Sequence, residues 1–409
     1  MSHYETYCLN CGEVQLDPYP FVCAVCGGLL GFRYDDASVR WDERFARSMW
    51  RYWRLLPVGN IDDLVHLDEG GTPLLPSRTF ADARVWLKDE TRNPTGSHKD
   101  RPLSVAVNNA RAIGAPTSFV VSTGSTGISN AAFAARAGLR SVVIMPTGTP
   151  DERVYPMFAL GSDIVRIEGA IDEVIDDVIR LCRSAGLYLS STSHSSNPYQ
   201  AEGCKTIAYE LQEQLGSVPE WIVVPVGGGG TLSAIWRGYQ DLLRLGHISQ
   251  TPKMVGVLPE HYNALEVAFV RGFTDWESVL DLPYDNPPPS ILVKLAHSYP
   301  PDGMEAIEAV RASGGHFIPV SDVESLAAQT ELAHGDGLYV EPSTGACVAG
   351  VKKLLSGSLV RGDDTIIALI SGSGFRETFV TAEMRPLRSQ VVAADQLGEV
   401  LIAANRPAD

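Results

Sequence analysis

The sequence predicts an α/β protein built on open, largely parallel sheets and preceded by a small cysteine-rich segment. Three observations lead to this prediction. From about residue 80 onward, short β-rich runs alternate with amphipathic helical patterns. Small polar, glycine-rich stretches follow several of these runs, and two CxxC pairs lie within the first 26 residues. Alternating strands and helices are typical of parallel sheets assembled from βαβ units.

The strand candidates are short and apolar, as expected for strands buried on both faces. They are the segments 118–122, 141–145, 163–167, 187–191 and 221–226, followed by MVGVL, HFIPV and TIIALI. Between them, apolar residues recur at helical spacing, for example Ile207, Leu211 and Leu215. So many strands favour two sheet-centred lobes over one. The proline-rich stretch 282–303 is expected to be a structured loop that crosses the surface.

Composition narrows the class of protein. The 409 residues are 44% hydrophobic and 20% charged, which is typical of a globular chain. The net charge of -16 argues against a nucleic-acid partner, because phosphate binding needs a basic face. No apolar run approaches the roughly 18 residues of a membrane helix, and the N-terminus lacks a secretory pattern. We therefore expect a cytoplasmic protein without a membrane partner.

The N-terminal cysteines predict a structural metal site. Two CxxC pairs, each followed by glycine, provide four thiolates: Cys8, Cys11, Cys23 and Cys26. In a reducing compartment this spacing is typical of knuckles that hold a tetrahedral Zn²⁺. Four sulfur ligands leave no open position on the ion, so such a zinc would fold the segment 1–35 and do no chemistry. The alternative is a small hairpin with four reduced cysteines.

Three loops that follow strand candidates contain small polar residues. They are VSTGSTGIS (121–129), PVGGGGTLS (225–233) and LISGSGF (369–375). In open α/β sheets, ligands bind at the carboxyl ends of strands, and a glycine run at a helix start lets backbone N–H groups converge on an anion. The glycine run fits neither GxxxxGK[ST] nor GxGxxG, which disfavours a nucleotide. A plain tight turn is the alternative.

Lys99 lies in the turn-rich stretch NPTGSHKDRP. A lysine that accompanies a phosphate cradle and small hydroxyl side chains, without a redox fingerprint, favours pyridoxal phosphate. The aldehyde of that cofactor condenses with a lysine amine. A solvated surface cation is the alternative for an isolated lysine.

Six segments occur in an order that resembles a known family. They are LDEGGTPLLPS, VWLKDETRNPTGSHKDR, VSTGSTGISNAAFAARAGLRSVVIMPTG, SSNPYQAEGCKTIAYEL, VPVGGGGTLSAIWRGYQDL and YVEPSTGACVAGVKKL. Together they resemble threonine synthases, which are fold-type-II pyridoxal-phosphate enzymes, over about residues 45–380. The CxxC pairs also resemble those of some threonine synthases. The resemblance implies a catalytic region of two interleaved α/β lobes over 36–409, the smaller at about 105–200, and a homodimer.

The resemblance also implies roles for individual positions. Lys99 would be the Schiff-base lysine and would move the α-proton of an amino-acid substrate. Ser371 would face the pyridine nitrogen of the cofactor. The cofactor phosphate would lie against Gly227, Gly228, Gly229, Gly230 and Thr231. The substrate α-carboxylate would lie against Ser122, Thr123, Gly124 and Thr126.

Several positions depart from the family pattern. Ser125 replaces an asparagine that contacts the 3-oxygen of the cofactor, and His98 replaces a phenylalanine, either as a packing residue or as a proton relay. His194 and Gln200 replace an asparagine and an arginine that bind the substrate phosphate, and an amide cannot replace a bidentate guanidinium. Three residues are candidates to supply the positive charge that this arginine would give to a phosphate: Arg153, Lys294 and a protonated His194. Ser195 completes the candidate substrate site.

These departures leave the reaction open. The first possibility is threonine synthase itself, which eliminates phosphate from O-phosphohomoserine and adds water. The second is a related β- or γ-elimination or replacement on another amino acid, as in a cysteate-synthase-like or specialised biosynthetic enzyme. A third, from another class, is a non-catalytic protein that uses its zinc ribbon for interaction. The intact Lys99 and glycine loop disfavour the third possibility.

Overall fold

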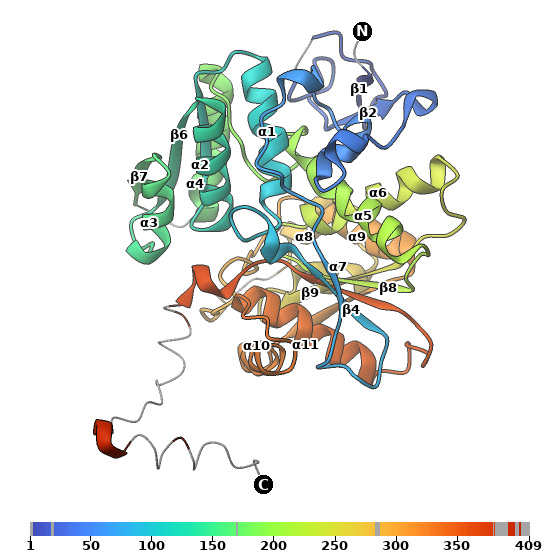
Figure 1. Ribbon diagram of the computed structural model, residues 1–409. Helices are drawn as coiled ribbons and strands as arrows, with labels where there is room; N and C mark the ends of the chain where they lie inside the picture. The colour runs from blue at the N-terminus through green and yellow to red at the C-terminus, as the bar shows by residue number, and fades with distance from the viewer. Residues whose placement is uncertain are drawn as a thin grey trace.

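The computed structural model describes residues 3–17, 20–168, 171–282, 287–378, 380, 392–396 and 401. The described residues form three sheets, of two, six and three strands (Figure 1). The six-stranded and three-stranded sheets each form the centre of a lobe, and the two-stranded sheet belongs to the N-terminal segment. The predicted α/β class with two sheet-centred lobes and a separate N-terminal cysteine-rich segment is therefore confirmed.

The N-terminal segment is an antiparallel pair, β1 (Tyr4–Cys8) and β2 (Leu30–Tyr34). It has a small core of its own, made by Cys8, Cys23 and Leu30. Tyr34 extends from β2 into the main core of the large lobe. The segment therefore packs directly on the large lobe, beside α1 (Asp100–Ala112) and above α6 (Gly230–Arg244) in the view of Figure 1.

The large sheet has the strand order β10-β9-β8-β11-β4-β3, and only β3 runs antiparallel to its neighbour. Its strands are β3 (Leu74–Pro76), β4 (Val85–Asp89), β8 (Trp221–Pro225), β9 (Lys253–Pro259), β10 (His316–Val320) and β11 (Ile366–Ile370). Every residue of β8 and β11 is buried, because helices cover both faces of the sheet.

The alternation of side chains along the strands divides this core into two layers. Ile367 and Leu369 of β11 pack into one layer, and Ile366 and Ile370 pack into the other. The first layer is covered by α5 (Thr206–Leu215), α6 (Gly230–Arg244), α7 (Ala264–Arg271), α8 (Trp276–Leu280) and α9 (Gly303–Ser313). The second is covered by α10 (Asp322–Asp336) and α11 (Pro342–Ser356), below the sheet in Figure 1.

The small lobe is a parallel sheet with the order β5-β6-β7. Its strands are β5 (Thr117–Val121), β6 (Arg140–Pro146) and β7 (Asp163–Ile167). The helices beside it are α1 (Asp100–Ala112), α2 (Ser125–Ala137), α3 (Asp151–Ala159) and α4 (Ile171–Ala185) (Figure 1). The packing of α1 against α2 joins this lobe to the Lys99 loop.

Short 3₁₀ turns connect these elements. They are η1 (Asp36–Ser38), η2 (Glu43–Phe45), η3 (Met49–Leu55), η4 (Ile61–Asp63), η5 (Glu90–Arg92), η6 (Gln200–Lys205), η7 (Gly374–Arg376) and η8 (Ala394–Gln396). The η3 turn buries Met49 and Trp50 against Val105 of α1 and Tyr199. The segment that follows the cysteine ribbon therefore contributes to the core beside Lys99.

Two sequence expectations about local structure are wrong. The segment 187–191 makes only an isolated bridge, Leu189 to Phe119, in place of a strand. Its backbone pairs with β5 only at Phe119, which donates to Tyr188 O at 3.0 Å and accepts from Ser190 N at 2.7 Å. The described part of the proline-rich stretch, 287–303, does not simply cross the surface. Leu292 and Leu295 are buried, and the stretch lines a cavity.

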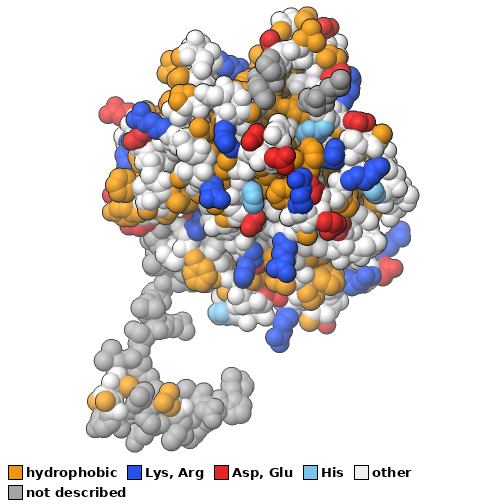
Figure 2. All heavy atoms as spheres, turned by 45° about the horizontal axis from the view of Figure 1, so that its top comes forward, with side chains coloured by type: hydrophobic (Ala, Val, Ile, Leu, Met, Phe, Trp, Pro, Cys, Tyr) orange, Lys and Arg blue, Asp and Glu red, His pale blue; other side chains and the backbone are white. Residues whose placement is uncertain are grey.

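Two further observations concern the surface. None of the helices in the described ranges is long and apolar enough to span a membrane. On the face shown in Figure 2, basic and acidic side chains are interspersed.

Candidate active site and cysteine cluster

A cavity of about 200 Å³ lies between the lobes, where β5, β8 and β11 end. It brings together most of the residues singled out from the sequence, which are Lys99, Ser122, Thr123, Gly124, Ser125, Thr126, Gly227, Gly228, Gly229, Gly230, Thr231 and Ser371. A wider, more open hollow of about 620 Å³ near Glu220 and His247 contains none of them. The carboxyl ends of parallel strands are where α/β sheets bind ligands, so we take the smaller cavity as the site.

Lys99 stands at the start of α1, in a turn fixed by the next residue. The buried carboxylate of Asp100 accepts hydrogen bonds from Thr95 N at 2.7 Å and Thr95 Oγ1 at 2.6 Å. Ser129 of α2 donates to the same carboxylate at 2.7 Å. The NPTG turn and the small lobe are therefore both tied to the residue that follows the lysine.

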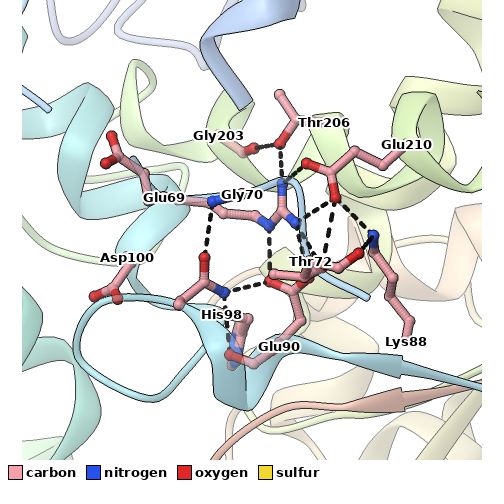
Figure 3. Close-up of polar contacts among 12 residues, drawn as sticks. Glu69, Gly70, Thr72, Lys88, Glu90, His98, Asp100, Gly203, Thr206 and Glu210 are labelled. Carbon is pink, nitrogen blue, oxygen red and sulfur yellow. Dashed lines mark hydrogen bonds and ion pairs between the residues drawn. The ribbon is translucent and has the colours of Figure 1, made fainter. Parts of the chain in front are cut away.

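A buried ion cluster close to Lys99 in the sequence, centred on Arg101, joins three sequence motifs (Figure 3). Arg101 is fully buried, and its guanidinium contacts Glu90 at 2.7 Å and Glu210 at 2.7 Å. It also bonds to the hydroxyls of Thr72 and Thr206. Lys88 pairs with Glu210 at 2.6 Å. EGGTP, NPTGSHKDR and EGCKT thus converge on one guanidinium, which explains structurally why these segments occur together.

The environment of Lys99 and His98 sets their protonation. Desolvation in the cavity lowers the pKa of the Lys99 amine. His98 Nδ1 lies 3.1 Å from the Ser371 carbonyl oxygen, and because a carbonyl only accepts, Nδ1–H is the donor. Burial and the nearby Lys99 charge lower the pKa of His98 to about 3. His98 is therefore a neutral imidazole in this site, which favours packing and orientation over a proton relay.

At the start of α6, the glycine loop places several backbone N–H groups without hydrogen-bond acceptors in the described part of the chain. Gly229 has φ of 102°, and a Cβ on Gly227 would lie 2.4 Å from the Lys294 carbonyl oxygen, so both positions need glycine. Within the described ranges, no acceptor is recorded for the backbone N–H groups from Gly227 to Leu232. Unsatisfied N–H groups at a helix start bind phosphate, so the residues present fit a pyridoxal phosphate.

Ser371 lies at the carboxyl end of β11, on the cavity wall. Its hydroxyl is 2.8 Å from Thr344 Oγ1, which also accepts from Gly372 N at 3.1 Å. Both hydroxyls are buried, so the network fixes the orientation of the Ser371 side chain. A neutral hydroxyl held in this way suits a pyridine nitrogen that does not need to stay protonated.

A second charged group at the cavity includes Lys294, which the sequence suggested as a compensating cation for a substrate phosphate. Lys294 Nζ contacts Glu341 at 2.6 Å and Glu377 at 3.0 Å, and reaches Ser125 Oγ at 3.3 Å. Glu377 also pairs with Arg153 of α3 at 3.2 Å. Glu341 lies in the motif YVEPSTG, but only the fold reveals that it faces Lys294.

The remaining candidate substrate residues do not line this cavity. Arg153 pairs with Glu377, and Ser195 O accepts from Arg183. His194 uses both ring nitrogens elsewhere, with Nδ1 at 2.6 Å from Glu305 and Nε2 at 2.7 Å from the Leu30 carbonyl. Burial alone would lower the pKa of His194, but Glu305 outweighs it and raises that pKa.

Gln200 lies in the η6 turn and is buried. With His194 it lines a narrow cavity of about 10 Å³, which Lys99 and Thr231 also border. Arg237, from α6, lines the same cavity. Gln200 is therefore beside the Lys99 site, although the structure does not place it on the main cavity wall.

The four N-terminal cysteines meet in one cluster, with all four Sγ atoms within 4.8 Å of one another. The Cys8–Cys26 and Cys11–Cys26 sulfurs are 3.5 Å apart, and those of Cys11 and Cys23 are 3.7 Å apart. A tetrahedral zinc with Zn–S distances of about 2.3 Å separates its sulfurs by about 3.8 Å. The four sulfurs therefore lie close enough together to hold one such ion.

Comparison with known proteins agrees with this site. Residues 65–372 match the family described as pyridoxal-phosphate dependent enzyme. The threonine synthase of Methanocaldococcus jannaschii is 34% identical over 90% of this chain and 92% of its own length. The threonine synthase of Synechocystis is 33% identical over 80% of this chain and 82% of its own.

Solved structures support the same fold. A crystal structure of O-ureido-L-serine synthase covers 81% of this chain and 96% of its own, with a TM-score of 0.62 and 21% identity. The processed threonine deaminase isoform 2 of Solanum lycopersicum covers 77% of this chain and 88% of its own, with a TM-score of 0.63 and 19% identity. The family match spans most of the chain, and the two curated relatives cover 90% and 80% of it. The chain therefore belongs to the fold-type-II pyridoxal-phosphate-dependent enzymes, as a threonine synthase-like member.

Proposed function

We propose that this protein is a pyridoxal-phosphate-dependent lyase or synthase that removes a β- or γ-substituent from an amino acid. The observation that supports this proposal most strongly is the cavity, which brings together Lys99, Ser371 and the N–H groups of the glycine loop that have no acceptor among the described residues. When bound, the cofactor supplies an electron sink that acidifies the α-proton of the substrate. The roles of individual side chains in this reaction are part of the proposal.

Each part of the cavity has one task in this proposal. Lys99 anchors the cofactor and then accepts the α-proton, which suits an amine whose pKa is lowered by desolvation. The start of α6 binds the cofactor phosphate through its N–H groups. Ser371 faces the ring nitrogen, and the loop Ser122–Thr126 binds the substrate carboxylate. The interlobe position of the cavity keeps water from the reacting centre.

The named candidate reaction is the conversion of O-phosphohomoserine to threonine, which the curated relatives' names favour. The alternative is a cysteate-synthase-like or specialised β- or γ-replacement with a substrate that carries no phosphate. Two observations favour the alternative. The Arg153 cation is already paired with Glu377, and His194 is engaged with Glu305. A phosphate would have to compete with these carboxylates.

We also propose a structural Zn²⁺ on Cys8, Cys11, Cys23 and Cys26. The sulfur–sulfur distances and the backbone donors Asn10 N and Val25 N, which point at Cys8 Sγ and Cys23 Sγ, support it. Such N–H contacts stabilise thiolates in a closed, non-catalytic site. A cytoplasmic homodimer is the state we expect, by analogy with the family.

The test is a substrate panel with the holoenzyme. O-phospho-L-homoserine, O-phospho-L-serine, L-serine and L-threonine are each incubated with the protein, and phosphate, 2-oxo acid and new amino acids are quantified. Turnover of at least one member is expected, with the visible absorbance of the lysine-bound cofactor present beforehand. Threonine and phosphate from O-phosphohomoserine would select threonine synthase. A protein that binds no cofactor would instead be a non-catalytic relative.

A further inference from the structure

Lys294 is placed unusually for a cation in this cavity. It belongs to the irregular stretch before α9, on the large lobe, but its side chain crosses to the first residues of α2 on the small lobe. A Cβ on Gly124 would lie 3.2 Å from Lys294 Cε, so the lysine packs closely against this glycine. The ammonium then reaches Ser125 Oγ at 3.3 Å.

The start of α2 is itself a positive region of the cavity. Ser122 Oγ accepts from Gly124 N and Gly127 N, which satisfies two of the first donors of the loop. The N–H groups of Ser125 and Thr126 have no acceptor recorded within the described ranges. A lysine beside a helix N-terminus brings two positive ends together, which is unfavourable without an anion between or beside them.

Two buried glutamates supply the negative charge in the structure. Glu341 accepts from Lys294 at 2.6 Å, and Glu377 lies 3.0 Å from the same nitrogen. Burial alone would raise the pKa of Glu341, but the charges of Lys294 and Arg376 outweigh it and lower that pKa, so the carboxylate is ionised. An ammonium has three hydrogens. In the structure it donates to Glu341 at 2.6 Å and to Ser125 at 3.3 Å, while Glu377 makes an ion-pair contact that lacks hydrogen-bond geometry.

We propose that Lys294 binds the α-carboxylate of the substrate together with the first N–H groups of α2, and thereby restricts the enzyme to amino acids with a free carboxylate. This inference rests on the proposed function. The substrate carboxylate replaces the long Ser125 contact as the third partner of the ammonium, while Glu341 and Glu377 keep the lysine in position. Lys294 is thus a specificity-determining residue that packs closely against Gly124.

The experiment compares acids with their amides. Holoenzyme is titrated with L-serine, L-threonine and L-homoserine and with the three corresponding amides, and the change in cofactor absorbance gives each half-saturation concentration. Native protein, Lys294→Met, Lys294→Arg and Lys352→Met are compared. Lys352 is a matched control, since it pairs with Glu331 at 2.7 Å on the exposed face of α11. Methionine keeps the unbranched length and removes the charge.

The expected result is specific to the carboxylate. Lys294→Met raises the half-saturation concentration for the acids by about ten- to a hundred-fold, as for a lost charge-assisted bond, and changes that for the amides by less than about threefold. Lys294→Arg retains part of the discrimination, and Lys352→Met behaves as the native protein. Without added amino acid, the cofactor spectrum of Lys294→Met matches that of the native protein.

Three outcomes would overturn the assignment. Equal weakening for acids and amides means a structural role, and an altered spectrum without amino acid means that Lys294 acts on the cofactor. A native holoenzyme that does not distinguish acids from amides also counts against it. Failure of the proposed function looks different, because the native protein then shows no lysine-bound cofactor absorbance before any titration.

Discussion

Arg101, two residues after Lys99, forms a bidentate ion pair with Glu210, with contacts of 2.7 Å from Nη1 to Oε1 and 2.8 Å from Nη2 to Oε2. Both side chains are buried. Arg101 comes from the first turn of α1 and Glu210 from α5, so the pair fixes the lysine-bearing segment to the large lobe. The Arg101–Glu210 pair therefore helps to position Lys99 through the backbone of α1.

Loss of the Arg101 guanidinium should lower the stability of the folded protein. Arg101→Met leaves the buried carboxylates of Glu90 and Glu210 without their main partner, which destabilises folding by about 3–5 kcal/mol. Arg33→Met is the matched control, because Arg33 pairs with Glu5 on the surface, where such pairs contribute about 0–1 kcal/mol. Urea unfolding followed by tryptophan fluorescence measures both. Equal unfolding midpoints for the two variants would contradict the structural role of the cluster.

Lys99→Ala should separate cofactor binding from chemistry. The variant keeps the open N–H groups of the glycine loop, so it still binds the cofactor phosphate, but it has no amine to anchor the aldehyde or to accept the α-proton. Turnover and the visible absorbance of the lysine-bound cofactor are both expected to disappear. Lys352→Ala serves as the control. An active Lys99→Ala protein would refute the assignment of this lysine.

The cysteine cluster predicts one zinc per chain. Metal analysis of freshly purified, reduced protein should give about one equivalent, and the double variant Cys8→Ser, Cys11→Ser should lose it because two of four ligands are gone. Cys182→Ser, a change at a buried cysteine outside the cluster, should retain the metal. Metal content that is zero in the native protein, or unchanged in the double variant, is incompatible with the site.

The sequence predicted the fold class and the composition of the cavity well, for physical reasons. Strands buried on both faces, such as β8 and β11, are apolar runs that are easy to recognise. The cavity residues lie in loops at the carboxyl ends of strands, where topology alone brings them together. The segment 187–191 is apolar enough to be predicted as a strand, but it pairs with β5 only at Phe119, and the length of such a pairing is decided by tertiary contacts.

The sequence named Arg153 and Lys294 as candidate cations, but it did not show that Glu341 and Glu377 pair with them. Lys294, Glu341, Glu377 and Arg153 come from four separate parts of the chain and meet only after both lobes are assembled. His194 occupies a motif position that implies a substrate contact, yet its ring binds Glu305 and the Leu30 carbonyl of the cysteine segment. Motif position predicts where a residue lies, but not which neighbour its side chain meets.

The last prediction concerns His98 and acid stability. The folded protein keeps His98 neutral down to a pKa of about 3, whereas the unfolded chain protonates near 6.5. Below about pH 6.5 the unfolded state therefore binds more protons at this position than the folded state. Stability from this group is fully present above that pH and falls by up to about 1.4 kcal/mol per pH unit as the pH decreases toward 3.

His98→Phe removes this titration and keeps a ring of similar shape. At about pH 7.5 the variant should lie within about 1.5 kcal/mol of the native protein, because it loses only the Nδ1–H bond to the Ser371 carbonyl, which still accepts from the backbone N–H of residue 98. Other acidic groups titrate alike in both proteins, so the difference in unfolding free energy isolates His98. As the pH falls to about 5.5, that difference should shift by about 1 kcal/mol in favour of the variant. A difference independent of pH would mean that His98 protonates in the folded state, which would restore it as a candidate proton relay beside Lys99.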